Sequence, residues 1–353
     1  MFLDPPEVLE PAKGDRFWVL YQPFLRHRGY ELRPRYQPDW QPSWQSKEKS
    51  GKFVSHFDYE DAAYMIPSTT LDAIRVRDGV KVAIRCVKKL ESQEIPILMR
   101  LNSPEMRADP RNRTVPVLDI LILPDRAFIV MPMLIFFHQF PFRHLGEFTE
   151  AIGQILQGLA FMHEQRIVHR DACSGNIMMD ASKIVPNGFH FVRWWSTDGI
   201  KWNVLWKERW SVRPTSYYFI DFETSFLLPR TPDLMFVNTG PLGQDKSVPE
   251  FNNGSTHYDG FKLDIYQVGN ALRKASLTYE DLAVFDPLFS AMTRLVPAER
   301  VSAAEAYQIF IGIVGSWSQK HLSRRIWIKG TPRLDRFLIR HFSRNNKAEN
   351  FPN

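Results

Sequence analysis

Alternating apolar and polar positions in the first third of the chain predict a β-hairpin. Its strands cover residues 73–76 and 81–87, and the intervening Asp78-Gly79 is a pair typical of tight turns. Two further apolar segments predict another pair of strands, at 115–121 and 128–131. We therefore expect a small β-rich unit in this part of the chain.

A helical period replaces this alternation further along. A long helix is predicted where apolar residues recur every three or four positions, at Phe148, Ile152, Ile155, Leu156, Leu159 and Met162. Similar patterns predict further helices at 282–295 and 303–313. The later part of the chain is therefore expected to be mainly helical.

Residues 1–60 form an arm that is rich in proline, arginine and aromatic residues. Its prolines are expected to prevent long helices and central strands. Because its aromatic side chains need cover, we expect the arm to pack against the body of the protein. Docking of a partner is the alternative.

Residues 180–216 form a second unusual segment, which carries Trp194, Trp195, Trp202, Trp206 and Trp210. A loop of this length in a compact domain is usually functional or disordered. Tryptophans at this density argue against disorder. We expect the segment to fold back on the body or to bind something.

The composition indicates a folded chain with a sizeable core. Of 353 residues, 44% are hydrophobic and 13% aromatic, which excludes a disordered protein. Cys86 and Cys173 are the two cysteines, too few for a disulfide framework or a zinc site. The start of the chain lacks the pattern of a signal peptide, and charged residues and prolines interrupt the most apolar zone, 115–137. We expect a soluble intracellular protein, in the cytoplasm or nucleus, without a transmembrane segment.

The net charge of +6 belongs mainly to the tail, residues 318–353. The tail holds nine Lys/Arg and two acidic residues, which leaves 36 basic against 37 acidic residues elsewhere. Its residues 333–341 predict a basic amphipathic helix, which would contact a membrane surface or an acidic partner. Docking on the larger, mainly helical part of the chain is the alternative. We expect no nucleic acid partner.

The strongest chemical signal is the stretch 169–176, which reads His-Arg-Asp-Ala-Cys-Ser-Gly-Asn. It matches the H-R-D-x-x-x-x-N catalytic loop of protein kinases. The spacing puts the carboxylate of Asp171 and the amide of Asn176 at the two ends of one short loop, where both can face one phosphate–metal cluster. Asp221-Phe222 follows, in the place of the D-F-G motif.

Val82-Ala83-Ile84-Arg85 occupies the place of the kinase V-A-I-K strand. In a strand, Ala83 and Arg85 share one face. The small alanine would lie beside an adenine, and the cation would reach phosphates. Glu94, at the start of a predicted helix, is the expected ion-pair partner of Arg85. The alternatives are an ordinary edge-strand arginine and a solvated glutamate.

Four features depart from the kinase pattern on the phosphate side. Arg85 replaces a lysine, and the two cations differ in size, shape and hydration. No G-x-G-x-x-G motif occurs at 65–71, so backbone amides lose a close approach to phosphates. Cys173 replaces a lysine, and its thiol would be either a small buried side chain that fills space or a reactive group. Glu223 replaces the glycine of D-F-G, where it would repel phosphates, bind a cation or point to solvent.

Residues from about 70 to 315 resemble a protein kinase domain. The phrases at 128–132, 158–164 and 218–222 look like a divergent group of fungal protein-kinase-like proteins. The resemblance implies an α+β, two-lobed fold with a small β-rich N-lobe and a larger, mainly helical C-lobe. It divides the chain into the arm 1–60, an N-lobe 61–134, a C-lobe 135–317 with the insertion 180–216, and the tail 318–353.

The resemblance also implies ATP and Mg²⁺ as cofactors. Asp171 would be the base, Arg170 would steady its loop, Asn176 and Asp221 would hold Mg²⁺, and Arg85 would pair with Glu94. The remaining implied contacts to ATP come from Ala83, Met131, Met133 and Leu134. Glu250 would pair with Arg300, and Asp264 and Gly269 match a kinase helix motif.

Two functions follow from this resemblance. The first is ATP-Mg-dependent phosphoryl transfer to Ser/Thr of a protein substrate, impaired by the four departures. The second is a pseudokinase, a non-catalytic module that binds a protein partner through the arm and the insertion.

Overall fold

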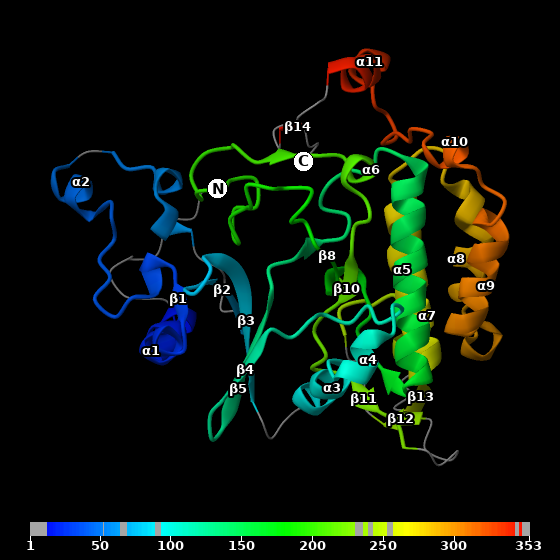
Figure 1. Cartoon of the computed structure of the whole chain (residues 1–353), viewed down its shortest axis with the longest axis horizontal. Coiled ribbons are helices and arrows are strands. Elements are labelled where there is room, and N and C mark those ends of the chain that lie inside the picture. Colours follow the sequence, from blue (N-terminus) through cyan, green and yellow to red (C-terminus); the bar gives the residue numbers. More distant parts are fainter. Residues whose placement is uncertain are drawn as a thin grey trace.

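The computed structural model describes residues 13–51, 53–63, 69–88, 93–229, 236–238, 243–252, 257–342 and 346–347. The chain ends 1–12 and 348–353 and residues 65–68 of the expected glycine-loop position lie outside the described residues. Figure 1 shows a sheet and short helices on one side and a bundle of longer helices on the other.

The N-terminal part is built on a five-stranded antiparallel sheet of order β1-β2-β3-β5-β4. The predicted hairpin is confirmed, because β2 pairs with β3 and Gly79 adopts a φ of +70° in the turn. The other predicted strand pair is confirmed as β4 and β5. The strand bounds are Tyr30–Leu32 (β1), Thr70–Arg75 (β2), Val80–Lys88 (β3), Asp119–Ile122 (β4) and Arg126–Pro132 (β5).

The arm packs on this sheet, as expected for its aromatic residues. Its first helix, α1 (Lys13–His27), buries Trp18 and Leu25 against Phe128 and Val130 of β5. The expectation that prolines exclude a long helix here is wrong, since α1 has 15 residues and contains Pro23. A proline removes one backbone hydrogen bond, and burial of the apolar face of α1 outweighs that loss. Strand β1 of the arm then pairs with β2 at the sheet edge.

The connection from β1 to β2 spans residues 33–69 and contains short 3₁₀ turns and α2 (Gln45–Lys49). Charged side chains hold it in place. Asp61 accepts hydrogen bonds from Trp40 Nε1 and the Ser43 amide, both at 2.9 Å. Arg35 Nη2 lies 2.7 Å from Asp15 Oδ2, and both side chains are buried. These contacts fix the described part of the connection, residues 33–51 and 53–63, against the sheet and α1.

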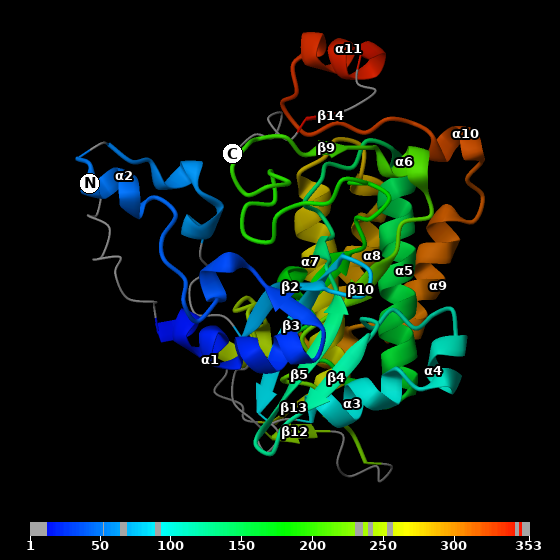
Figure 2. The ribbon, with the colours of Figure 1, turned by 60° about the vertical axis from the view of Figure 1, so that its left-hand side comes forward.

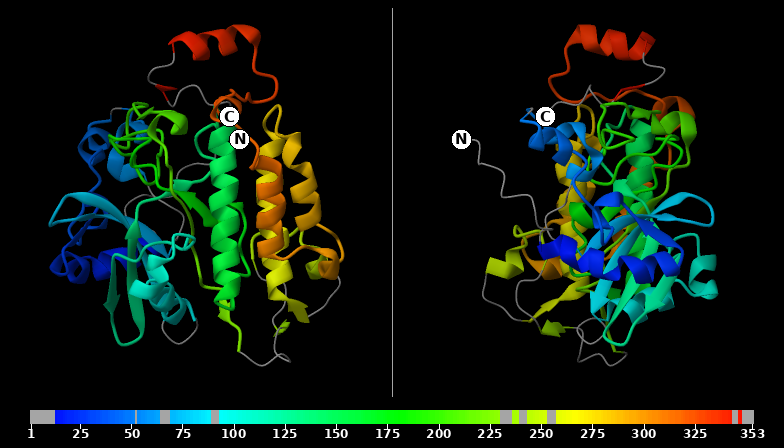
Figure 3. Two further views of the ribbon diagram at one scale, coloured as in Figure 1. Left: turned by 45° about the vertical axis from the view of Figure 1, so that its right-hand side comes forward. Right: turned by 90° about the vertical axis from the view of Figure 1, so that its left-hand side faces the viewer.

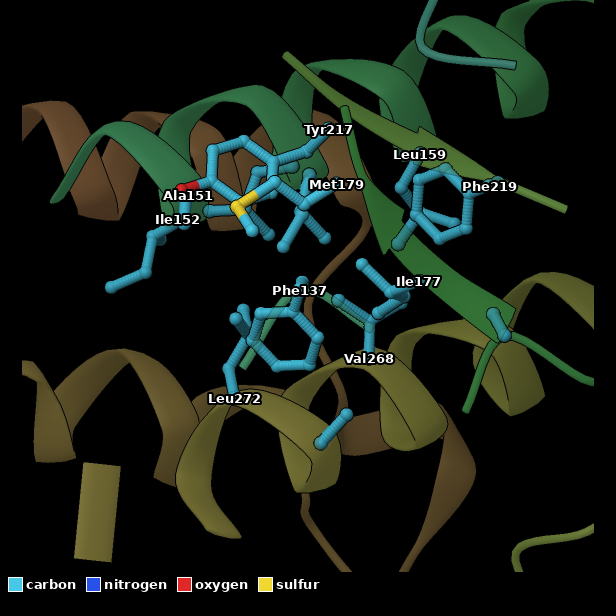
Figure 4. Close-up of a cluster of buried hydrophobic side chains, with 14 of the residues drawn as sticks. Phe137, Ala151, Ile152, Leu159, Ile177, Met179, Tyr217, Phe219, Val268 and Leu272 are labelled. Carbon is cyan, nitrogen blue, oxygen red and sulfur yellow. The ribbon is translucent and has the colours of Figure 1, made fainter. Parts of the chain in front are cut away.

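The C-terminal part packs helices around the long α5 (Leu145–Glu164). The predicted periodicity is confirmed, because the apolar face of α5 is buried against β8, β10 and α7 (Figure 4). The helix expected over 282–295 is shorter, since a 3₁₀ turn at Ala283–Phe285 precedes α8 and Pro287 stands in its first turn. The other helices are α3 (Glu94–Leu101), α4 (Pro104–Ala108), α6 (Arg209–Val212), α7 (Gly260–Leu277), α8 (Asp286–Met292), α9 (Ala303–Val314), α10 (Gln319–Leu322) and α11 (Arg333–Phe342).

Short strands connect the helices to the loops of the site. They are β6 (Ile135–Phe136), β7 (Ile167–Val168), β8 (Ile177–Met179), β9 (Leu205–Trp206), β10 (Tyr217–Phe219), β11 (Phe226–Leu227), β12 (Phe236–Asn238), β13 (His257–Asp259) and β14 (Asn346–Lys347). An antiparallel N-terminal sheet followed by a mostly helical part makes an α+β fold, consistent with two kinase-like lobes.

The insertion 180–216 folds back on the body. Trp206 is only 2% exposed and belongs to the main core. Arg209 is also buried, and its Nη2 donates hydrogen bonds to the carbonyls of Phe137 and Phe140 at 2.9 and 3.0 Å. Figure 2 shows the loops of this segment between the arm and the helices. Of the two outcomes expected for this segment, folding back on the body is the one observed, although Trp202 stays 53% exposed.

No helix within the described ranges has both the length and the apolar character needed to cross a membrane.

Candidate active site

The buried carboxylate of one residue fixes the backbone of the loop 169–173. Asp264 of α7 is fully buried and accepts hydrogen bonds from the backbone amides of His169 and Arg170, each at 2.7 Å. Its Oδ2 also lies 3.1 Å from His163 Nε2. Arg170 adopts a left-handed φ of +67°, a strained conformation that the surrounding contacts must hold. Arg170 Nη1 donates to the Thr224 carbonyl at 3.0 Å, in agreement with its expected role of steadying the loop.

Asp171 and Asn176 are brought together at the ends of this loop. Asn176 Nδ2 donates to the Asp171 carbonyl at 2.8 Å and to Asp171 Oδ2 at 2.9 Å. Both side chains are buried, and the 3₁₀ turn Ser174–Asn176 sets their spacing. The carboxylate and the amide therefore face one point.

Gln244 is a third member of this cluster, which the sequence did not indicate. Its amide N–H donates to Asp171 Oδ1 at 2.8 Å, and its Nε2 lies 3.1 Å from Asp171 Oδ2 and 3.4 Å from Asn176 Oδ1. The preceding Gly243 has a φ of +103°, and a Cβ there would lie 2.9 Å from Asp171 Oδ1. The position of Gln244 follows from its short chain distance to Glu250, which is anchored elsewhere.

That anchor is the predicted pair of Glu250 and Arg300, which is confirmed. Arg300 Nη1 and Nη2 lie 2.6 and 2.7 Å from Glu250 Oε1 and Oε2. Both residues are buried, so this two-pronged pair fixes the end of the segment that carries Gln244.

Arg85 of β3 lies at the centre of a second charged cluster. Its Nε is 3.0 Å from Glu94 Oε1, which confirms the expected ion pair. Its Nη2 also contacts Asp221 Oδ1 and Glu223 Oε2, each at 2.7 Å. Burial disfavours the Arg85 cation, but the three carboxylates outweigh this and raise its pKa. Burial also raises the pKa of Glu94, to about 7.

Glu223 therefore binds Arg85 instead of standing apart from the site. A glycine at this position would have a backbone freedom that Glu223 lacks. The left-handed residue is instead Asp221, with a φ of +62°, whereas Glu223 is not among the residues of positive φ. Phe222 between them is buried against the ring of His169, at 4.9 Å between ring centroids. His169 is fully buried, as expected for a packed structural residue.

A cavity of about 580 Å³ lies beside Arg85 and Asp221. This volume suits a small organic ligand or cofactor. Most residues proposed for ATP border it, namely Ala83, Arg85, Met131, Leu134 and Asp221. Met133 does not border it. Met133 lies in the chain between the end of β5 and the start of β6, and its side chain packs against the main core. Its assignment to the cofactor site is therefore not supported by the lining of this cavity.

The insertion supplies the outer wall of this cavity. Phe189, Phe191 and Trp194 border it together with Thr70, the first residue of β2, and the preceding Thr69. The wall is tied to the N-terminal part by polar contacts, because Lys81 Nζ donates to the Phe189 carbonyl at 3.0 Å. Nothing in the sequence pattern placed these aromatic residues at the cavity.

A clasp between the arm and the insertion holds this wall. His190 Nε2 lies 3.0 Å from Glu60 Oε1. Arg193 Nη1 donates to the carbonyls of Phe57 and Tyr59 at 2.9 and 3.3 Å. The arm and the insertion, which are more than 100 residues apart in sequence, therefore meet near the mouth of the cavity.

Cys173 is suited to packing and not to reaction. It is 6% exposed, and burial, followed by the charge of Asp171, raises the pKa of its thiol to about 12. The thiolate is the nucleophilic form. The interpretation of Cys173 as a small buried filler therefore agrees with the structure.

The donors at the site suit a hard cation. Asp221 offers a carboxylate and Asn176 an amide oxygen, both of which are ligands that Mg²⁺ accepts. Within the described ranges no group of three or more His, Cys, Asp or Glu residues is arranged to hold a metal ion.

Comparison with known proteins gives one distant similarity. No protein-family model matches the chain. Over 155 residues, 40% of the chain, it is 29% identical to mitogen-activated protein kinase kinase kinase 5 of Arabidopsis thaliana. The match spans 20% of the length of that protein. This partial similarity indicates the protein kinase superfamily and, with the two clusters above, supports a kinase-like domain.

Proposed function

We propose that this kinase-like domain binds ATP with Mg²⁺ and transfers its terminal phosphate to Ser/Thr of a protein. One observation carries the proposal. Gly175, in the loop between Asp171 and Asn176, borders two cavities at once. One is the 580 Å³ cavity with Arg85 and Asp221, and the other, of about 410 Å³, includes Lys246 and Lys274. Asp171 itself borders neither cavity, but the loop that carries it lies between them, which supports a nucleotide in the first cavity and a polypeptide substrate in the second.

The residues have separate roles in this proposal. Asp171 accepts the proton of the substrate hydroxyl, whose oxygen bonds to the γ-phosphorus as the bond to the leaving ADP oxygen breaks. Asn176 and Asp221 would hold Mg²⁺, which neutralises phosphate charge. Arg85, held by Glu94, would contact the phosphates. Ala83, Met131 and Leu134 would enclose the adenine.

A non-catalytic function is the second candidate, and it is favoured by a specific observation. Asp221 is bonded to Arg85, and Asp171 is bonded to Gln244. The proposed metal ligand and the proposed base thus both have protein partners. In this alternative the domain is a pseudokinase that binds a protein partner through the arm and the insertion.

The finer assignment that we propose is the divergent fungal protein-kinase-like group. It rests on the phrases at 128–132, 158–164 and 218–222 and on the arm.

Two measurements separate these functions. We expect Mg²⁺ with millimolar ATP to raise the melting temperature of the protein, and ATP without Mg²⁺ to raise it less. Phosphate transfer from γ-labelled ATP to a generic protein substrate should then be lost in Asp171→Asn. The exposed Asp39 of the arm offers a matched control, Asp39→Asn, which should retain transfer.

Each failure has a distinct meaning. A folded protein whose melting temperature does not respond to Mg-ATP would contradict nucleotide binding itself. A clear Mg-ATP response without transfer by the wild type would favour the pseudokinase. Equal transfer by wild type and Asp171→Asn would exclude Asp171 as the base.

A further inference from the structure

The tail helix α11 has an exposed apolar face. Leu334, Phe337 and Leu338 are 67%, 54% and 45% exposed, and their spacing places them on one side of the helix. Figures 1 and 3 show α11 beyond α10 at one end of the molecule, set apart from the helical bundle. The predicted amphipathic helix is confirmed, and its apolar side is not buried in the large lobe.

Arg336 connects α11 to the body of the protein. Arg336 Nη2 and Nη1 lie 2.6 and 2.8 Å from Glu280 Oε1 and Oε2. The Arg336 guanidinium also lies 5.5 Å from the centre of the Trp327 ring. A helix that serves only its own fold normally turns its apolar stripe inward. Leu334 and Phe337 instead remain more than half exposed, which indicates that this part of the apolar face serves an external surface.

A groove of about 510 Å³ runs between α11 and the body. Leu338 and Ile339 border it on the helix side, and Arg143 and Lys329 border it on the body side. Arg143 is 6% exposed, and among the described residues its Nε has no hydrogen-bond partner. The Arg143 guanidinium lies 5.7 Å from the centre of the Trp206 ring and near Glu208, and it adds positive charge at the groove beside the exposed Lys329.

The charge of this end of the molecule is strongly positive. Residues 318–342 contain seven Lys/Arg and one acidic residue, Asp335, which also borders the groove. Five of the basic side chains are exposed, namely Lys320, Arg324, Lys329, Arg333 and Arg340. A second copy of the chain would bring two such ends together, so charge repulsion disfavours it.

We propose that α11 and its groove form a docking site for an anionic phospholipid bilayer. The apolar face of α11 enters the boundary between headgroups and acyl chains, and the exposed basic residues contact lipid phosphates. One anionic headgroup enters the groove beside Arg143 and Lys329. The contact is peripheral and does not depend on the proposed phosphate transfer.

The test uses the full chain and vesicles of phosphatidylcholine, with or without 30% phosphatidylserine. We expect sedimentation with the anionic vesicles only. Leu334→Glu/Phe337→Glu should weaken this binding by about tenfold or more, since it puts charge on the inserted face. Lys329→Glu should weaken it by roughly tenfold through the groove. Leu295→Glu and Lys201→Glu alter exposed residues elsewhere and should bind like the wild type.

Three outcomes would overturn the proposal, provided that circular dichroism shows every variant to be folded. The first is absence of binding to anionic vesicles at 50 mM salt. The second is equal binding by wild type and Leu334→Glu/Phe337→Glu. The third is a dimer in vesicle-free buffer that the same double variant dissolves, because the face would then belong to a second copy. Binding to immobilised polyglutamate without any binding to vesicles would instead assign the site to an acidic protein.

Discussion

Arg85 Nη2 lies 2.7 Å from Asp221 Oδ1, so the proposed phosphate-binding cation is bonded directly to the proposed metal ligand. The same nitrogen contacts Glu223 at 2.7 Å. Hydrogen bonds between charged groups are the stronger kind. Mg²⁺ must therefore compete with a guanidinium for Asp221, which gives a physical reason for weak nucleotide binding.

Arg85→Lys should relieve this competition. A lysine ammonium is a compact charge without the planar fork that lets Arg85 reach Glu94 and two further carboxylates together. Since such a contact is worth about 1.5–3 kcal/mol, we expect Mg-ATP affinity to rise by about tenfold or more. Titration calorimetry measures it. Arg77→Lys, at an exposed arginine of the β2–β3 turn, is the control. Unchanged or weaker affinity in Arg85→Lys would contradict the competition.

Glu94 should make stability depend on pH in the neutral range. Burial raises the pKa of Glu94 from 4.5 to about 7, so the folded state holds this proton more tightly than the unfolded state does. The stabilisation is full below pH 4.5 and is lost as the pH rises through 7. A change of this size corresponds to about 3 kcal/mol.

Urea unfolding at pH 5 and pH 8 checks this dependence. As the pH rises from 5 to 8, the wild type should lose unfolding free energy relative to Glu94→Gln, because the variant has no carboxyl group to ionise at this position. Glu31→Gln, at an exposed glutamate of β1, should unfold with the pH dependence of the wild type. The same slope in wild type and Glu94→Gln would contradict the elevated pKa.

The sequence predicted those parts of the fold that depend on local patterns. The β2–β3 hairpin follows from alternation and a tight turn, and α5 follows from its helical period. The pairs Arg85–Glu94 and Glu250–Arg300 were found because their residue types occupy positions of a known motif order. Neighbours along the chain therefore determine the hairpin and the helix, whereas the order of the motifs identifies the two ion pairs.

Contacts between segments that are distant in the chain were missed because no local pattern marks them. Gln244 lies against Asp171 because the chain returns there from elsewhere, and no local period marks a single polar residue in a loop. The helix α1 tolerates Pro23 because burial against β5 outweighs a local preference. Phe191 borders the cavity only because the insertion is held to the arm.

Gln244→Ala should expose the proposed base. The side-chain amide that lies 3.1 Å from Asp171 Oδ2 and 3.4 Å from Asn176 Oδ1 would be gone, while the backbone bond to Oδ1 remains. If Gln244 occludes these groups, phosphate transfer should increase several-fold with little change in stability. The rate of transfer at saturating Mg-ATP measures this. A fall in the rate would instead show that Gln244 positions Asp171. The control is Gln319→Ala in helix α10, which should transfer phosphate at the rate of the wild type.

Arg193→Ala should release the clasp between the insertion and the arm. Arg193 is buried, and its loss leaves the buried carbonyl of Gly199, as well as those of Phe57 and Tyr59, without this donor. An unsatisfied buried polar group costs about 1–3 kcal/mol, so we expect unfolding at lower urea and faster limited proteolysis within 189–204. Mg-ATP binding should weaken too, because Phe189 and Trp194 would no longer be held at the cavity. The exposed Lys201 of the same segment provides the matched control, Lys201→Ala. If Arg193→Ala resists protease as well as Lys201→Ala does, the wall of the cavity holds its position without the clasp, and its aromatic packing alone must fix it.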